Sequence, residues 1–415
     1  MNAETNPPSD QLFKLMYGKK SGGIAFLLIL SFVLLRFFVF YDYKPLWIDE
    51  QISVNAACGD STLNAYSFEE LKHIRSQNQN EPGFLSKVFY ANIQNDRSNA
   101  LLYDFTLSAW VHFFGLNLFS VRALSLFCFL LVLLAARGLS KELHTKPFFL
   151  FAMLLSSSLL FRYNMEARTY MFSLCLSLWS TLFLLRYLRD RKFALLLVYL
   201  VLVLLSIFSH YLVVVVFIWH GFFVLKTSKK EIKFKLLGGY LVLLFVFFSL
   251  LYLLDQSTGF ITQLAQANTN ITQNAPKSLH FKPFTFQNLV TGLVQVLSQN
   301  FGLSLQSLFQ IRYFAVFLLI PVYFIYKSYK DKTSRSNSFF VLLIGVHLLF
   351  LMAVSALSGN TTVFQLCYSI FVLPYYLLYF TQLSTVVSIK PVEQMLKWSV
   401  VAISLMDTVG YIYLA

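Results

Sequence analysis

Charged residues and paired cysteines are both scarce in this chain. Only 13% of its 415 residues are charged, whereas soluble domains carry about 25%. Cys128, Cys175 and Cys367 lie in apolar runs and Cys58 stands alone in a polar loop, so no pair has metal-ligand spacing. We therefore expect neither a disulfide nor a cysteine-bound zinc ion. A Gly-rich phosphate loop, a His-Glu-x-x-His motif and a nucleophile elbow are also absent, which argues against ATP-driven transport by this chain.

Long hydrophobic runs are what the sequence has in abundance. It is 57% hydrophobic, with a mean hydropathy of +0.63. Helices of about 20 apolar residues match the thickness of a bilayer. We therefore predict an all-α polytopic membrane protein with about 11 transmembrane helices (range about 10–13). The predicted spans are residues 24–40, 119–137, 147–162, 168–186, 193–208, 211–225, 236–254, 308–326, 339–357, 361–382 and 397–414.

The basic residues outnumber the acidic ones and give the chain a formal net charge of +14. Such a charge can serve nucleic-acid binding, but most of these residues sit in short loops between apolar runs, which is the positive-inside pattern of a membrane protein. We therefore expect no nucleic-acid partner. Residues 1–23 carry Lys14, Lys19 and Lys20, and no small-residue cleavage site follows the first apolar run. The sequence thus predicts a cytoplasmic tail and a retained first helix.

The segment 99–115 decides the topology. Asp104, Ser108 and His112 recur at every fourth position and would share one helical face. A helix with a narrow polar stripe and a tryptophan, here Trp110, suits the membrane surface. An interfacial helix leaves most basic residues on the cytoplasmic side, whereas the alternative, a true span, would turn many of them outward. We predict the interfacial helix and two outer loops, residues 41–118 and 255–307.

Trp47, Asp49 and Glu50 lie just beyond the predicted outer end of the first span. Two adjacent carboxylates at a membrane boundary are costly unless they are solvated or used. One can accept a proton from a nucleophile while the other orients it or binds a cation. Asp49 and Glu50 are thus candidate catalytic residues that could hold a divalent metal ion but do not require one. The alternative is an ordinary solvated start of a loop.

A short polar hairpin with two arginines, Arg162 and Arg168, separates two apolar runs and also falls on the predicted outer side. Arginine at this place runs against the positive-inside rule. It suits a phosphate group, however, because a guanidinium binds phosphate through two charge-assisted hydrogen bonds. Glu166 could pair with either arginine. The alternative is a structural Arg–Glu pair that caps two helices.

Three further basic residues are weaker candidates for contacting a phosphate. His210 stands at the break between two apolar runs and could contact a phosphate or a carboxylate, although a lone His at a helix junction is more often structural. Lys277 and Lys282 lie in the second outer loop and could reach a lipid phosphate, although basic residues near headgroups often only bind lipid.

Taken in order, these elements resemble the membrane glycosyltransferases of the GT-C superfold. The most similar branch is glycosyltransferase family 39, which includes protein O-mannosyltransferases and the transferase that puts aminoarabinose on lipid A. Four stretches carry the resemblance: Trp47 to Glu50; Asn99 to Tyr103 with Trp110, Phe114-Gly115 and Arg122 to Ser125; Glu166 to Tyr170, which is similar to the family's Glu-Ala-Arg-x-Tyr hairpin; and Ser209-His210-Tyr211.

Two places depart from the family pattern. Asn99 to Tyr103 stands where the family often has His-Pro-Pro-Leu-Tyr. Cys367-Tyr368 stands where an Arg-Tyr pair often opens a late span. The second departure removes one phosphate contact and leaves open whether Lys277, Lys282 or Arg312 replaces it.

The resemblance implies a catalytic transmembrane module at residues 24–225, followed by a second module at residues 226–415. It implies an inverting glycosyltransferase that moves a sugar from a polyprenyl-phosphate carrier to a hydroxyl of a lipid, glycan or protein acceptor. Asp49 or Glu50 would be the base. The donor phosphate would be contacted by Arg162, Arg168, His210, Lys277 and Lys282, and supporting residues would be Trp47, Tyr103, Arg122, Glu166, Tyr170 and Tyr211.

The expected location is a bacterial inner membrane, in contact with membrane lipids, with the site facing the periplasm or the exterior. An outward site excludes nucleotide sugars as donors, because those are cytoplasmic. A rival hypothesis is a transporter or flippase of a lipid-linked sugar or polysaccharide, which would need polar residues buried along a path in mid-span. A third, a scaffold in an envelope complex, explains none of the motifs.

Overall fold

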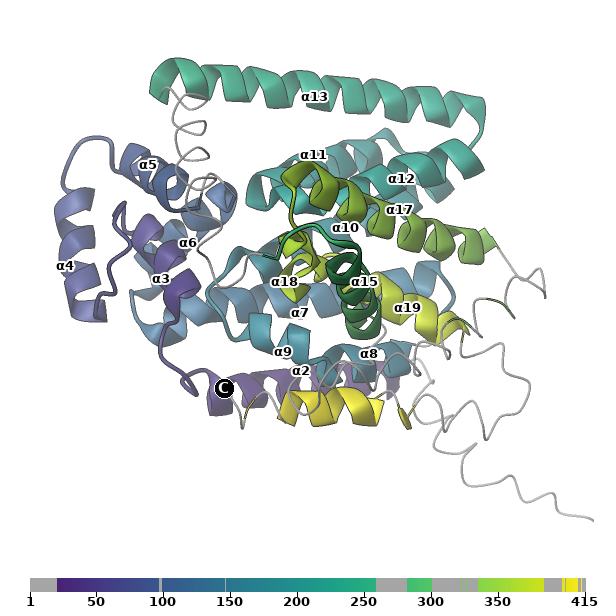
Figure 1. Cartoon of the computed structure of the whole chain (residues 1–415), viewed down its shortest axis with the longest axis horizontal. Coiled ribbons are helices and arrows are strands. Elements are labelled where there is room, and N and C mark those ends of the chain that lie inside the picture. The colour runs from purple at the N-terminus through teal and green to yellow at the C-terminus, as the bar shows by residue number, and fades with distance from the viewer. Residues whose placement is uncertain are drawn as a thin grey trace, which may run out of the picture. The chain divides into compact units, whose positions relative to one another are not determined.

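The computed structural model describes residues 21–96, 99–145, 147–258, 282–300, 335–383, 398–399 and 401–409, together with residues 322, 326 and 412. Across these residues the regular structure is helical, apart from one isolated bridge between Pro283 and Asn360 (Figure 1). The prediction of an all-α chain is therefore confirmed for the described residues. The chain divides into two compact units, residues 1–43 and residues 44–415.

The first unit contributes one helix, α2 (Ser21–Phe40), which contains the first predicted span. More than half of the surface of Leu27, Leu28, Leu35 and Phe38 is exposed. A helix that is hydrophobic all round requires an apolar environment, which agrees with a membrane span. Most of the predicted cytoplasmic tail, residues 1–20, lies outside the described residues.

In the second unit, four helices build the first predicted outer loop. They are α3 (Ile48–Ala57), α4 (Phe68–Gln79), α5 (Phe84–Asp96) and α6 (Leu101–Phe114), and α3 packs on both α5 and α6. α4 begins with a capping box in which Ser67 and Glu70 satisfy each other's backbone N–H groups. Arg75 of α4 donates to the carbonyls of Ala57 and Ser108. The loop is thus a folded helical layer that positions the start of α3.

α6 coincides with the helix predicted at residues 99–115, but the first part of its polar stripe faces inward. Asp104 and Ser108 are buried, whereas His112 is exposed. Asp104 Oδ2 accepts a 2.7 Å hydrogen bond from Asn92 Nδ2 of α5. The stripe therefore serves packing within the helical layer, and its orientation along the membrane plane stays a prediction.

The other helices of this unit are mostly apolar. In chain order they are α7 (Leu118–Glu142), α8 (Pro147–Ser156), α9 (Ser158–Asn164), α10 (Thr169–Asp190), α11 (Phe193–Ser209), η1 (Tyr211–Val213), α12 (Val214–Thr227), α13 (Lys230–Thr258), α15 (Phe286–Asn300), α17 (Arg335–Ser358), η5 (Thr362–Phe364), α18 (Leu366–Ser369) and α19 (Leu373–Leu383).

Among the described helices, four are long and apolar enough to cross a membrane: Leu118–Glu142, Thr169–Asp190, Lys230–Leu253 and Phe339–Ser358. Shorter apolar helices occupy Phe26–Phe40, Pro147–Ser156, Phe193–Ser209 and Tyr211–Thr227. These segments agree with a membrane protein, while the number of about 11 spans stays a prediction.

Two predicted spans are interrupted. Residues 147–162 divide at Ser157, whose hydroxyl accepts from the backbone N–H of Leu160 and so begins α9. Residues 361–382 divide into η5, α18 and α19, and Pro374 lies in the first turn of α19, where a missing N–H does no harm. Of the predicted span 308–326, only residues 322 and 326 are described, and of 397–414 only 398–399, 401–409 and 412.

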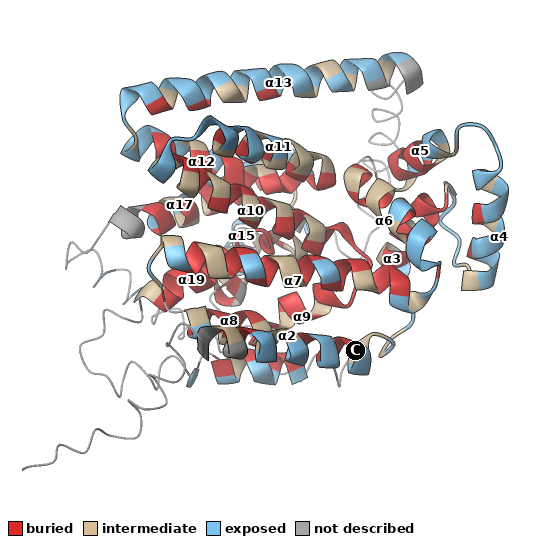
Figure 2. Ribbon diagram, turned by 180° about the vertical axis from the view of Figure 1, so that it is seen from behind, coloured by how far each residue is buried: buried red, intermediate tan, exposed pale blue. Residues whose placement is uncertain are grey.

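Burial differs sharply between α10 and α13. α10 packs against α7 and α11, and Figure 2 shows most of it buried. α13 is mostly exposed in the same view, and more than half of the surface of Leu241, Phe245 and Phe248 is open. An exposed apolar helix surface of this extent marks contact with a membrane or another protein.

A line of hydroxyl groups runs along the buried face of α10. Thr169, Ser173, Ser177 and Thr181 recur at every fourth position and are fully buried. Thr169 Oγ1 donates to the carbonyl of Ser209 at 2.7 Å, and the hydroxyl oxygens of Ser173 and Ser209 lie 2.8 Å apart. Small polar residues of this kind let helices approach closely while their hydroxyls stay bonded.

Candidate functional site

The site is built around a buried ion pair between α3 and α7. Glu50 and Arg122 are both fully buried. Arg122 donates from Nε to Glu50 Oε1 at 2.9 Å and from Nη2 to Oε2 at 2.7 Å. Glu50 Oε1 also accepts from the backbone N–H of Ala167 at 2.8 Å. One carboxylate therefore joins the start of α3, the start of α7 and the hairpin that precedes α10.

Asp49 and Glu50 do not fit a shared metal ion. Both oxygens of Glu50 accept hydrogen bonds from Arg122, and Oε2 also receives the backbone N–H of Trp47 at 3.4 Å. A carboxylate engaged by a guanidinium on both oxygens has little left to offer a second cation. We therefore assign no metal ion to this pair.

Asp49 has a different environment from its neighbour. It is half-buried in the first turn of α3, where the helix dipole stabilises a negative charge. Its backbone carbonyl accepts from Arg168 Nη1 at 3.0 Å. Its carboxylate makes no hydrogen bond or ion pair with any residue that the structure describes. Asp49 thus presents an available carboxylate at a fixed place.

Arg168 holds this arrangement together. Its Nη1 donates to the Asp49 carbonyl and, at 3.0 Å, to Ser53 Oγ, and it lies 3.6 Å from Asp96 Oδ2. Burial alone would lower the pKa of Arg168, but the nearby charges, with Asp96 first among them and Asp49 also contributing, hold that pKa above its usual value. Only 5% of Arg168 is exposed. Arg168 is therefore a buried cation whose hydrogen bond to the Asp49 carbonyl holds the backbone at Asp49 in place.

A further carboxyl lies close to this cation. Asp104 of α6 is fully buried, and burial, followed by the charge of Asp96, raises the pKa of Asp104 well above its usual value. Burial therefore favours the neutral form of Asp104, whose Oδ2 accepts from Asn92 Nδ2.

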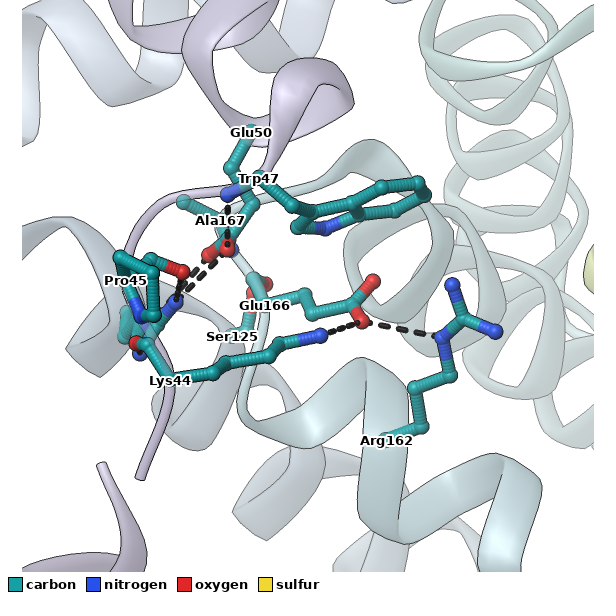
Figure 3. Close-up of polar contacts among 9 residues, drawn as sticks. Lys44, Pro45, Trp47, Glu50, Ser125, Arg162, Glu166 and Ala167 are labelled. Carbon is teal, nitrogen blue, oxygen red and sulfur yellow. Dashed lines mark hydrogen bonds and ion pairs between the residues drawn. The ribbon is translucent and has the colours of Figure 1, made fainter. Parts of the chain in front are cut away.

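Glu166 forms the centre of a second cluster, the Lys44–Glu166–Arg162 triad (Figure 3). Its Oε1 accepts from Lys44 Nζ at 2.7 Å and from Arg162 Nε at 2.9 Å. Both cations also lie against the ring of Trp47, with Lys44 Nζ at 5.4 Å and Arg162 Cζ at 5.0 Å from its centroid. Two positive charges share one negative charge, and 33% of the Arg162 side chain is exposed. The three side chains of the triad together carry one net positive charge.

His210 belongs to an aromatic wall. Its ring centroid lies 5.5 Å from that of Tyr170, 6.1 Å from that of Tyr368 and 4.7 Å from that of Phe371. Burial, followed by the charge of Arg168, lowers the pKa of His210 to about 3. The imidazole is thus neutral at physiological pH. Both ring nitrogens are engaged within the protein, because Nδ1 accepts from the backbone N–H of Leu212 at 3.3 Å and Nε2 lies 3.5 Å from Asn99 Nδ2.

The remaining predicted residues lie in different settings. Tyr103 is fully buried with its ring 6.0 Å from that of Phe172. Tyr211, next to His210, is 54% exposed. Lys282 is exposed, and among the described residues only its backbone carbonyl is engaged, by Thr361. Lys277 lies outside the described residues.

The structure thus brings Asp49 and Arg168 into direct contact, as a single shared site requires. Nine predicted residues gather in this region: Trp47, Asp49, Glu50, Arg122, Arg162, Glu166, Arg168, Tyr170 and His210.

Sequence reasoning missed Lys44, Ser53 and Asp96. Nothing in the local pattern marked them, because each acts on a partner more than 70 positions away. Tyr368, at the place of the second departure from the family pattern, lies in the aromatic wall beside Cys367.

In the part of the chain that the structure describes, the fold is helical with several apolar helices, and the site is a cluster of ion pairs beside the carboxylate of Asp49. No family model matches the chain, and no curated protein or solved structure matches it either.

Proposed function

We propose that this protein is an inverting glycosyltransferase that uses a polyprenyl-phosphate-linked sugar as its donor. The observation that carries the proposal is the pairing of two opposite features in one region. The Asp49 carboxylate has no partner among the described residues, and the Lys44–Glu166–Arg162 triad has a positive charge in excess. A base for the acceptor and an anion site for the leaving group are the two groups that such a transfer needs.

Asp49 accepts the proton of the acceptor hydroxyl as the oxygen attacks the anomeric carbon of the sugar. The new carbon–oxygen bond forms on the face opposite the phosphate, and the bond between the anomeric carbon and the phosphate oxygen breaks with its electrons staying on the phosphate. The transition state resembles an oxocarbenium ion. Attack opposite the leaving group inverts the anomeric centre.

The charges favour the triad over Arg168 as the place of the phosphate. A phosphodiester carries one negative charge, which the excess charge of Lys44 and Arg162 over Glu166 complements. Arg168 instead faces Asp49 and Asp96 and is almost fully buried. We therefore assign it to positioning Asp49, and Arg162 with Lys44 to stabilising the phosphate as it leaves.

A membrane setting supports a lipid-linked donor. The exposed apolar surface of α13 and the four long apolar helices provide a surface along which a prenyl chain can lie. We propose that the site opens to the outer side of a bacterial inner membrane, as the charge pattern predicts.

The decisive experiment compares the glycolipids and glycans of a deletion strain by mass spectrometry. We expect one sugar-modified product to disappear, to return with the wild-type gene and to stay absent with the Asp49→Asn variant. Unchanged glycolipids and glycans after deletion would defeat the proposal.

A transporter is the second candidate, and the line of hydroxyls along α10 is the observation in its favour. These hydroxyls are bonded to one another and to helix carbonyls, as Ser173 is to Ser209 and Thr181 is to the Ser177 carbonyl. The simpler interpretation is that these hydroxyls form hydrogen bonds that hold neighbouring helices together. A lipid-flipping assay with the wild type and Asp49→Asn distinguishes the transporter from the glycosyltransferase. A transporter should move the lipid-linked sugar equally well in both proteins, because that movement does not require the carboxylate of Asp49.

A further inference from the structure

Two buried polar atoms beside the triad have no hydrogen-bond partner among the described residues. One is Nε1 of Trp47, a donor, and the other is Oε2 of Glu166, an acceptor. Glu166 is fully buried, so its second oxygen cannot rely on bulk water. Buried polar atoms without partners are uncommon in folded proteins, because the hydrogen bonds that they lose with water are not replaced. Because one is a donor and the other an acceptor beside the same cations, a single polar group between them could satisfy both.

The geometry places both residues around the same cations. Lys44 and Arg162 bind the other oxygen of Glu166, at 2.7 and 2.9 Å, and both lie within 5.4 Å of the Trp47 ring centroid. Figure 3 shows the indole above the Glu166 carboxylate, with Lys44 and Arg162 approaching from opposite sides. The unpartnered donor and the unpartnered acceptor therefore border the proposed phosphate site.

A hydroxyl group matches this pair of atoms. Its oxygen can accept from Trp47 Nε1 while its proton is donated to Glu166 Oε2. A phosphate oxygen would satisfy only the indole and would be repelled by the carboxylate. An apolar chain would satisfy neither. The apolar face of the Trp47 ring can also pack against the C–H groups of a sugar.

We propose that Trp47 and Glu166 form a sugar-binding subsite that holds a hydroxyl of the donor's sugar next to its phosphate. This inference rests on the proposed function and adds the residues that distinguish a sugar-bearing lipid phosphate from a bare one. The hydroxyl lies between Trp47 Nε1 and Glu166 Oε2, while Lys44 and Arg162 hold the phosphate.

The test measures binding to purified protein in lipid nanodiscs by isothermal titration calorimetry. The probes are farnesyl phosphate and farnesyl phosphates that carry glucose, galactose, mannose, arabinose or xylose. The variants are Trp47→Phe, which keeps a ring beside the cations but lacks the N–H, and Trp179→Phe, a matched change on α10 away from the site.

We expect the wild-type protein to bind at least one sugar-bearing probe more tightly than farnesyl phosphate. Trp47→Phe should weaken the binding of that probe roughly three- to tenfold, which is the effect of one lost hydrogen bond. It should leave the affinity for farnesyl phosphate unchanged. Trp179→Phe should change neither. Among deoxy derivatives of the preferred sugar, the one that lacks the bound hydroxyl should bind equally well to the wild type and Trp47→Phe.

The outcomes separate the subsite from the proposed function. If Trp47→Phe keeps the full sugar preference, or weakens both kinds of probe equally, the subsite is wrong while lipid-phosphate binding stands. The subsite is equally wrong if the wild type binds farnesyl phosphate and prefers no sugar. If the wild type binds none of the probes, the proposed function and the subsite fall together.

Discussion

Asp49 and Glu50 are neighbours in sequence with opposite environments. Successive residues of a helix point about 100° apart, so the first turn of α3 directs one carboxylate into the protein and the other toward its edge. Glu50 meets Arg122 and the backbone of Ala167, whereas Asp49 keeps an unpartnered carboxylate among the described residues. The sequence identified both as candidate bases. The structure favours Asp49, because a base must be able to receive a proton.

Replacing Asp49 with asparagine should abolish transfer and spare the fold. Loss of a general base costs about 10²–10⁴ in rate. The half-buried carboxylate forms no ion pair with the described residues but lies at the start of α3 and near Arg168, so losing its charge should lower stability by no more than about 1 kcal/mol. A reconstituted transfer assay and thermal unfolding in detergent measure the two effects. Asp42→Asn, at an exposed position, is the control and should transfer normally. Full transfer by Asp49→Asn would show that another group is the base.

Replacing Arg122 with methionine should destabilise the protein, because it leaves the buried charge of Glu50 without its partner. Removing one member of a buried pair typically costs about 3–5 kcal/mol. The double variant Glu50→Gln/Arg122→Met should recover part of that loss, because the unpaired charge is gone. Thermal unfolding measures both.

The control for this pair is Lys235→Met, which breaks an ion pair with Glu231 in which the two side chains are 59% and 75% exposed. Exposed pairs contribute about 0–1 kcal/mol, so this variant should unfold nearly as the wild type does. A double variant no more stable than Arg122→Met alone would contradict a penalty from the buried charge.

At the scale of helices, hydropathy predicted where apolar segments lie but not where they break. α7, α10 and α11 match their predicted spans to within a few residues, because long apolar runs dominate their local sequence. The break at Ser157 and the division of residues 361–382 occur inside apolar runs. Hydropathy does not change there, so it cannot predict where one helix ends and the next begins. The ion pairs of the site could not be predicted from the sequence either, because partners such as Glu50 and Arg122 are 72 positions apart.

The contact between α7 and α10 depends on one glycine. A Cβ added at Gly138 would lie 2.6 Å from Cδ2 of Leu182, which is 1% exposed and has little room to move. Gly138→Ala should therefore destabilise the protein by about 1–3 kcal/mol through overpacking. Thermal unfolding checks this against Gly221→Ala on α12, where no atom lies within 4 Å of the added carbon. That control should be neutral or stabilising, and equal melting temperatures for the two variants would show that the helices can separate freely.

At the scale of the whole molecule, the distribution of basic residues predicts which loops face outward. In a variant without the four natural cysteines, His112→Cys in α6 should react with a membrane-impermeant maleimide in intact cells. Ser228→Cys, between α12 and α13 and flanked by Lys226, Lys229 and Lys230, should react only after permeabilisation. Labelling in the reverse order would invert the topology and place the site in the cytoplasm, where a nucleotide sugar could serve as donor.

The triple engagement of Glu50 has a consequence for how the chain is made. Its carboxylate is bound by Arg122 and by the backbone of Ala167, and Ala167 is added to the growing chain 117 residues after Glu50. Until the hairpin before α10 has been synthesised, the acidic segment lacks one of its two distant anchors. The contacts of α3 with α7 and with the hairpin before α10 can therefore be completed only after all three segments have been synthesised. A nascent chain halted before this hairpin would lack part of the site, even though several of its apolar helices would already have been synthesised.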